Sequence, residues 1–118
     1  MSLIIRRMKK EDISQVQHVA KVSWNDTYEG IIPEDVQNKF LESSYSKKSL
    51  MYRLENSHLW VAEVDGVIVG FANYSYLKKN GDVELGAIYL LPNYQGRGIG
   101  SALLQTGLSQ INGMKRLI

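Results

Sequence analysis

The spacing of apolar residues in the first half of the chain predicts one strand followed by two or three helices. An apolar run at residues 3–8 is typical of a strand. Apolar residues then recur every three or four positions over residues 11–24, 33–41 and 47–55, as on one face of a helix. The predicted apolar faces consist of Ile13, Val16, Val19, Ala20, Trp24, Val36, Phe40, Leu41, Leu50, Met51 and Leu54.

The middle of the chain changes to the pattern of β-strands. Residues 59–64 and 67–74 are strand-like, and the Asp-Gly pair at 65–66 between them is a strong signal for a two-residue hairpin. A second turn at 79–82 leads to a third predicted strand over residues 83–91, which ends at a proline. We therefore expect a meander of three strands.

A glycine-dense segment, residues 94–101, separates this meander from a last predicted helix. The Asn-Gly pair at 112–113 is a typical helix stop, and residues 114–118 resemble the beginning of another strand. The element order predicts a single α/β or α+β domain over residues 1–118. The apolar positions of the last helix are Ile99, Leu103, Leu104, Leu108 and Ile111.

Composition narrows the possible functions. The chain has 118 residues, 44% of them hydrophobic, and it has no cysteine, which excludes disulfides, thiolate catalysis and cysteine-based zinc sites. A net charge of +2, dispersed along the chain, gives no reason to expect a nucleic-acid ligand. No apolar run approaches a membrane span, so we expect a cytoplasmic protein without a membrane partner. His18 and His58 lack neighbours at metal-ligand spacing, and we expect no metal.

The glycine-dense segment predicts a phosphate-binding loop. A strand, then glycines, then the start of a helix presents several backbone N–H groups to an anion. A Walker A loop is excluded because no Lys-Ser or Lys-Thr pair follows, and a Rossmann fingerprint fits poorly because Ser101 occupies its third glycine position. A nucleotide-binding domain is therefore a distant alternative, and a different phosphorylated cofactor is expected.

The spacing that does fit is Gln/Arg-x-x-Gly-x-Gly/Ala, here Gln95 to Gly100. Together with residues 88–92 in front and 102–104 behind, it resembles the acyl-CoA-binding motif of the GCN5-related N-acetyltransferase (GNAT) family. The resemblance implies a mixed, mostly antiparallel sheet that is flanked by helices and splays open beside the cofactor. It also implies an N-acetyltransferase that uses acetyl-CoA as its co-substrate and a primary amine of a small molecule or peptide as acceptor.

The same resemblance assigns a cofactor site. The pantetheine arm would pair with the exposed backbone edge of the family's fourth strand, where an N–H of Ile88 or a neighbour would polarise the thioester carbonyl. The loop would hold the pyrophosphate, with charge from Arg97. The residues implied to bind the cofactor are Ile88, Tyr89, Leu90, Gln95, Gly96, Arg97, Gly98, Ile99, Gly100 and Ser101.

Two further segments carry candidate chemistry. The distance of Glu84 before Gln95 matches the glutamate that deprotonates the amine in histone-acetylating family members. The alternative is a surface carboxylate on one strand face. Residues 24–33 resemble the W-x-x-T-Y-x-G-x-x-P stretch of a bacterial branch, whose loop lines the acceptor pocket. There we expect Trp24 to lie mainly in the core, and Tyr28 and Glu29 to contact the acceptor.

The family normally continues beyond the point that corresponds to Ile118, with the rest of the fifth strand, a helix and two more strands. The resemblance thus implies a chain truncated after the start of the fifth strand, without the tyrosine that usually protonates the thiolate. We expect a homodimer that covers the bare sheet edge. The alternative function is a non-catalytic or degenerate acyl-CoA-binding domain.

Overall fold

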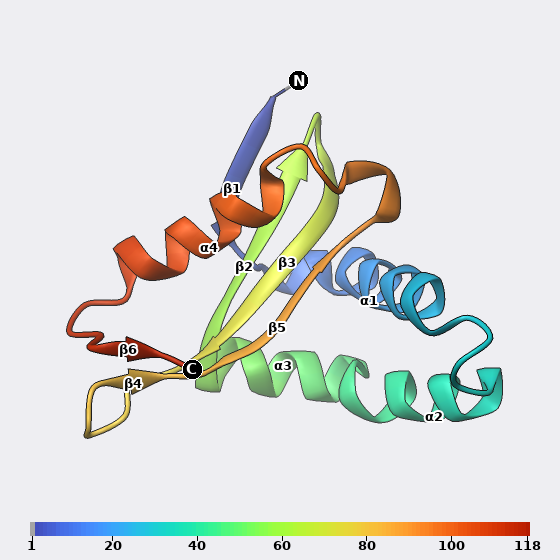
Figure 1. The fold of residues 1–118 in the computed structure, drawn as a ribbon, viewed down its shortest axis with the longest axis horizontal. Helices are drawn as coiled ribbons and strands as arrows, with labels where there is room; N and C mark the ends of the chain where they lie inside the picture. Colours follow the sequence, from blue (N-terminus) through green and yellow to red (C-terminus); the bar gives the residue numbers. More distant parts are fainter. Residues whose placement is uncertain (1) are drawn as a thin grey trace.

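A computed structural model describes residues 2–118, and Figure 1 shows a sheet with helices on both faces. Four strands form the main sheet in the order β1-β2-β3-β5, and all three pairings are antiparallel. The predicted fold class, a mostly antiparallel sheet flanked by helices, is confirmed. The strands are β1 (Leu3–Arg7), β2 (Ser57–Val64), β3 (Val67–Ser75) and β5 (Leu85–Leu90).

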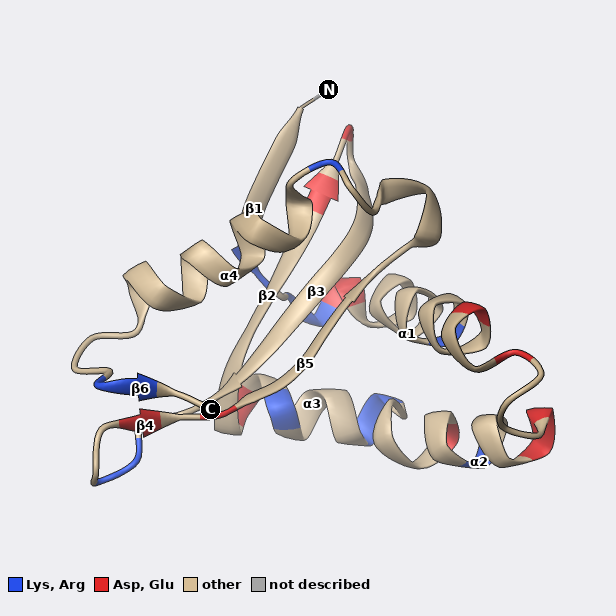
Figure 2. Ribbon diagram, viewed as in Figure 1, with Lys and Arg blue, Asp and Glu red and all other residues tan. Residues whose placement is uncertain are grey.

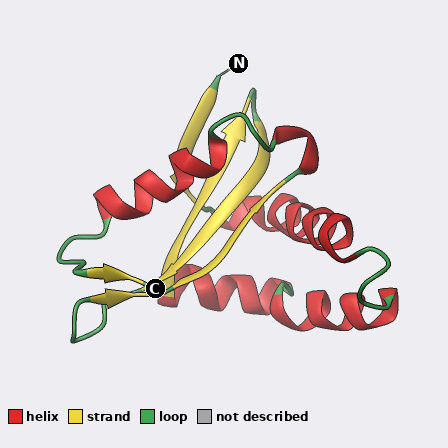
Figure 3. Ribbon diagram, viewed as in Figure 1, coloured by secondary structure: helices red, strands yellow, loops and turns green. Residues whose placement is uncertain are grey.

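The helices divide between the two faces of this sheet (Figures 1 and 3). Helices α1 (Ile13–Tyr28), α2 (Glu34–Ser44) and α3 (Lys47–Asn56) share one hydrophobic cluster with one sheet face. Helix α4 (Ile99–Gln110) packs on the other face in a second cluster. Short 3₁₀ turns, η1 (Lys10–Asp12) and η2 (Pro92–Tyr94), precede α1 and α4.

The predicted hairpin at 65–66 is confirmed, because Val64 and Val67 pair across it and both turn residues have positive φ. The prediction of one continuous strand over residues 83–91 is wrong. The structure divides this segment into β4 (Asp82–Val83) and β5, with Glu84 between them. Strand β4 pairs in parallel with β6 (Arg116–Leu117), whereas β5 pairs with β3.

A β-bulge accompanies this change of partner. Tyr74 of β3 lies opposite Leu85, but the preceding Asn73 lies opposite Ala87, so Gly86 is left over on β5. An extra residue on one strand bends it and increases its twist, which is the physical reason for the divided strand. Asp82 of β4 ties this strand to β6, because both of its carboxylate oxygens accept hydrogen bonds from the Arg116 guanidinium, at 2.8 and 3.1 Å.

Helix α4 lies close against the sheet through a narrow face. Ile99, Leu103 and Gly107 are buried at intervals of four, and the Tyr74 hydroxyl donates a hydrogen bond to the Leu103 carbonyl at 2.9 Å. Leu108, which the apolar spacing placed on this face, is instead 45% exposed. The helix turns by 100° per residue, so Gly107 rather than Leu108 meets the sheet. Among residues 2–118, no helix combines the length and apolar character needed to cross a membrane.

Candidate functional site

Strand β5 is the last strand of the main sheet in residues 2–118, and one of its backbone edges is open. The Leu91 N–H donates to the Val69 carbonyl of β3 at 2.8 Å. Hydrogen bonding alternates along an antiparallel strand, so the backbone groups of Leu90 and Ile88 face away from β3. The Leu90 carbonyl already accepts a hydrogen bond from the Ser23 hydroxyl of α1 at 2.6 Å. Ile88 therefore presents its N–H and C=O at the open edge.

This edge leads directly into the glycine loop, which ends at the first turn of α4. Gly96 and Gly98 have φ of 75° and 80°, a left-handed conformation that side chains beyond glycine rarely adopt. The first hydrogen bond of α4 runs from the Ala102 N–H to the Gly98 carbonyl. The N–H groups of Ile99, Gly100 and Ser101 thus precede the helical ladder and are free to bind an anion.

Most residues of the loop are exposed, which leaves its backbone N–H groups accessible to an anion. Gln95, Gly96, Arg97, Gly98 and Ser101 are exposed, whereas Ile99 is fully buried and anchors the helix start in the second hydrophobic cluster. The Arg97 guanidinium carbon lies 5.2 Å from the centre of the Tyr94 ring, which keeps its charge beside the loop. The structure thereby brings the predicted edge residues and the predicted loop residues into one continuous stretch of backbone.

Glu84 lies at the break between β4 and β5. Its backbone is fixed by Ser75, whose N–H donates to the Glu84 carbonyl and whose hydroxyl accepts from the Glu84 N–H, both at 2.8 Å. Its carboxylate is 60% exposed and lies 3.4 Å from the Lys78 ammonium. It also lines a hollow of about 210 Å³ together with Gly86 of the bulge. A carboxylate in this position is in direct contact with solvent.

Trp24 belongs to an aromatic cluster under the sheet. Its ring stacks on Phe40 at 4.1 Å and packs against Tyr28 at 4.5 Å, and its indole N–H donates to the Tyr89 hydroxyl at 3.0 Å. Tyr45 of the same cluster is buried, which raises the pKa of its hydroxyl to about 12. Trp24 therefore serves packing, and it ties α1 to the strand with the open edge.

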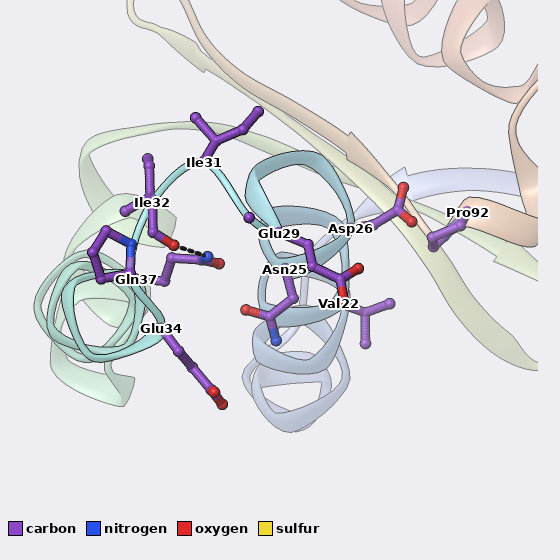
Figure 4. A pocket seen from close by; sticks show the side chains of 11 residues that line it. Val22, Asn25, Asp26, Glu29, Ile31, Ile32, Glu34, Gln37 and Pro92 are labelled. Atoms are coloured by element: carbon purple, nitrogen blue, oxygen red, sulfur yellow. Dashed lines mark hydrogen bonds between the residues drawn. The ribbon is translucent and has the colours of Figure 1, made fainter.

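A larger pocket, of about 740 Å³, lies where the end of α1, the start of α2 and Pro92 meet (Figure 4). Of the two predicted acceptor residues, Glu29 lines this pocket and Tyr28 does not. The lining residues that the sequence interpretation did not name as acceptor contacts include Asn25 and the buried Gln37. The only signal for Gln37 was its position four residues before the buried Leu41, on the inner face of α2. In residues 2–118, no group of three or more metal-ligating side chains is placed to hold a metal ion.

Comparison with known proteins adds three findings on related chains. The sequence model of the acetyltransferase (GNAT) family matches residues 17–116. The chain is 32% identical over 110 residues to the spermidine N(1)-acetyltransferase of Thermoplasma acidophilum, covering 88% of this chain and 67% of the relative. It is 36% identical over 107 residues to an uncharacterised N-acetyltransferase of Bacillus subtilis, covering 87% of this chain and 61% of that protein.

Among solved structures, the fold resembles that of the PaiA N-acetyltransferase from Thermoplasma acidophilum in complex with coenzyme A. The TM-score is 0.88 at 28% sequence identity, with 94% of this chain and 72% of that chain covered. The chain thus spans between 61% and 72% of the length of these three proteins.

Proposed function

Because this chain belongs to the acetyltransferase (GNAT) family of acyl-CoA-dependent enzymes, we propose that it transfers an acetyl group from acetyl-CoA to a primary amine. The observation that carries the proposal is the open edge of β5 running directly into the glycine loop and the start of α4. Such a stretch offers one row of backbone hydrogen bonds to an extended chain and a second group of N–H donors to phosphate.

In the proposed complex, acetyl-CoA lies along this stretch. The amides of the pantetheine arm pair with the backbone of Ile88 to Leu90, as an added strand would. The pyrophosphate accepts hydrogen bonds from the N–H groups between Gly96 and Ser101, where the positive end of the α4 dipole and Arg97 add favourable charge. Gln95 and Gly98 shape the loop, and Ile99 holds the first turn in place.

The proposed reaction needs a neutral amine and a polarised thioester. Glu84 takes a proton from the acceptor ammonium, directly or through water, and the freed nitrogen attacks the carbonyl carbon. The Ile88 N–H stabilises the oxygen as it becomes negative. The C–N bond forms, the C–S bond breaks, and CoA leaves as a thiolate; the attacking nitrogen gives up its second proton to water as it becomes an amide, and the thiolate takes up one proton from water.

In this proposal the part of the acceptor remote from its reacting amine contacts the pocket that Glu29 lines, with Tyr28 at its margin, while the amine itself reaches Glu84 at the other end of β5. A primary amine on a small molecule or peptide suits the family. The relative from Thermoplasma acidophilum is named a spermidine N(1)-acetyltransferase, which makes a polyamine one candidate acceptor for this chain. A homodimer and a cytoplasmic location stay predictions, and light scattering tests the first.

The test is the release of free CoA thiol from acetyl-CoA with a panel of amines. Glu84→Gln should abolish turnover and leave the affinity for CoA unchanged, whereas Glu55→Gln, an exposed carboxylate of α3, should leave both unchanged. Unchanged turnover in Glu84→Gln would show that another group deprotonates the amine. CoA binding without thiol release for any amine would establish the alternative, a non-catalytic acyl-CoA-binding domain.

A further inference from the structure

Lys78 places a primary amine of the chain itself beside the proposed base. Its ammonium nitrogen lies 3.4 Å from a carboxylate oxygen of Glu84, and its side chain is 46% exposed. In the proposed reaction, the ammonium of any acceptor must reach this same carboxylate to lose its proton. Lys78 thus occupies the position that the reaction requires of an acceptor amine.

The backbone on both sides of this pair is fixed. The Lys78 N–H donates to the Asp82 carbonyl, and the Lys78 carbonyl accepts from the Gly81 N–H, both at 2.9 Å. Ser75 holds the Glu84 backbone through two further hydrogen bonds of 2.8 Å. A tight turn between β3 and β4 therefore keeps the lysine next to the carboxylate. Such a tether replaces an encounter between two molecules by a contact within one, which favours reaction.

Within residues 2–118, Glu84 is the only carboxylate that pairs with Lys78. Figure 2 shows basic residues in the turn before β4 and an acidic residue on β4 itself. That carboxylate, Asp82, accepts two hydrogen bonds from the Arg116 guanidinium instead. The neighbouring Lys79 is also exposed, but it forms no ion pair with a side chain of residues 2–118. Of these two adjacent lysines, one alone is placed for proton transfer.

The spacing along the strand fits an acetyl transfer to this amine. Ile88, whose N–H is proposed to bind the thioester oxygen, follows Glu84 by four residues, or about 13 Å of extended strand. Three contacts of about 3 Å each bridge most of this distance: carboxylate to amine, amine to carbonyl carbon, and carbonyl oxygen to N–H. The Glu84 side chain covers the remainder. Gly86, between the two residues, is exposed and has no side chain to obstruct the amine.

We propose that Lys78 is a self-acetylation site, at which the chain transfers the acetyl group of its bound acetyl-CoA to its own Lys78 Nζ. Glu84 takes one proton from the ammonium, and the neutral nitrogen attacks the thioester carbonyl carbon. The C–N bond forms and the C–S bond breaks. The nitrogen gives up its second proton to water as it becomes an amide, and the CoA thiolate takes up one proton.

The inference rests on the proposed function, because the same base and the same co-substrate act in both reactions. Acetylation removes the positive charge of Lys78. Glu84 then loses its ion pair, and its carboxylate is open to the ammonium of an external acceptor. Self-acetylation is therefore a single event for each chain that precedes turnover with added amines.

The test is incubation of the native chain with acetyl-CoA alone, followed by site-resolved mass spectrometry. Lys78 should gain an acetyl group at least about tenfold faster than Lys79, the matched control for uncatalysed acetylation. Glu84→Gln should remove this difference, because the proton acceptor is lost. Equal rates at the two lysines of the native chain, or a difference that persists in Glu84→Gln, would overturn the inference.

Two further measurements test the acceptor and the intramolecular step. Lys78→Arg keeps a positive charge beside Glu84 but offers a guanidinium, which stays protonated. This variant should take up one acetyl group fewer than the native chain, whereas Lys79→Arg should take up the early acetyl group as the native chain does. The rate constant at Lys78 should not depend on protein concentration. A rate constant that rises in proportion to concentration would show transfer between molecules and contradict the proposal.

The panel of free amines separates this inference from the proposed function. Thiol release with added amines, while Lys78 stays unmodified, would keep the proposed function and refute self-acetylation. Acetylation of Lys78 that depends on Glu84, without thiol release by any added amine, would keep self-acetylation and refute transfer to a free acceptor. The absence of both would refute both.

Discussion

Gly107 determines how closely α4 approaches the sheet, and a single methyl group tests that contact. A Cβ built on Gly107 would lie 2.6 Å from both Cε1 and Cε2 of Tyr74, far inside normal contact. The Tyr74 ring is fully buried and its hydroxyl donates a hydrogen bond to the Leu103 carbonyl, so the ring cannot move aside to make room for the new methyl group. Gly107→Ala must therefore push α4 away from β3 and break that hydrogen bond.

The magnitude follows from two opposing effects. Overpacking at a fixed ring costs up to about 3 kcal/mol. Alanine in a helix interior gains about 1 kcal/mol over glycine. We expect a net loss of about 2 kcal/mol in the free energy of unfolding, measured by urea denaturation followed by tryptophan fluorescence. Because α4 carries the glycine loop at its first turn, the affinity for CoA should fall as well.

The matched control is the same substitution earlier in the same helix. A Cβ on Gly100 would lie 3.5 Å from Leu90 Cδ1, an ordinary contact, so Gly100→Ala should keep or increase the stability by up to about 1 kcal/mol. Opposite signs for the two variants are the expected result. A Gly107→Ala protein as stable as the Gly100→Ala protein would show that α4 does not rest on Tyr74, and the loop placement would be wrong.

Three other measurements follow from the structure. Gly98→Ala forces a side chain into a left-handed turn and should weaken CoA binding at least about tenfold by calorimetry, whereas Gly66→Ala, which introduces the same strain in the hairpin after β2, should change it little; equal effects would contradict the loop geometry. The Arg6 guanidinium beside Asp12 holds the pKa of that carboxyl below its usual range. The ion pair therefore contributes fully to the free energy of unfolding above pH of about 4, the pKa of an aspartate in the unfolded chain, and this contribution is lost as the pH falls through the lowered pKa of Asp12 in the folded protein. Asp12→Asn should flatten the acid limb of the urea-denaturation profile, and an unchanged profile would refute that coupling. Burial raises the pKa of Tyr45 to about 12, so an alkaline absorbance titration should contain an ionisation step near pH 12, and Tyr45→Phe should remove that step.

Local signals were sufficient for most of the fold. The Asp-Gly pair specified the hairpin after β2 because only a few residues fit its backbone, and the period of the apolar residues located α1, α3 and α4 to within a few residues. The divided strand was missed because β4 pairs with residues 116–117, and no local pattern reports a partner so distant along the chain. Gly86 inside the predicted strand was a signal for the bulge.

The candidate site also contains one part that a local sequence motif indicates and another that depends on contacts between distant segments. The proposed cofactor stretch from Ile88 to Ser101 is continuous in sequence, so the resemblance of one motif to that of the family was enough to propose it. The larger pocket joins the end of α1 to α2 and Pro92, and its buried amide at Gln37 depends on how two helices meet. Glu29 was found through the family motif, whereas Gln37 lies outside that motif and only the packing revealed its unpaired oxygen.

The central claim is that CoA binds along β5 and the glycine loop, and a CoA titration of the isotope-labelled protein followed by amide resonances tests it most directly. The account predicts that the N–H signals of Ile88, Gly98, Gly100 and Ser101 shift most, while those of the hairpin at residues 65–67 stay in place. ATP at the same concentration should not reproduce the shift at Ile88, since ATP lacks the pantetheine arm. Shifts that spare Ile88 and the loop, or no shift at all, would contradict the account.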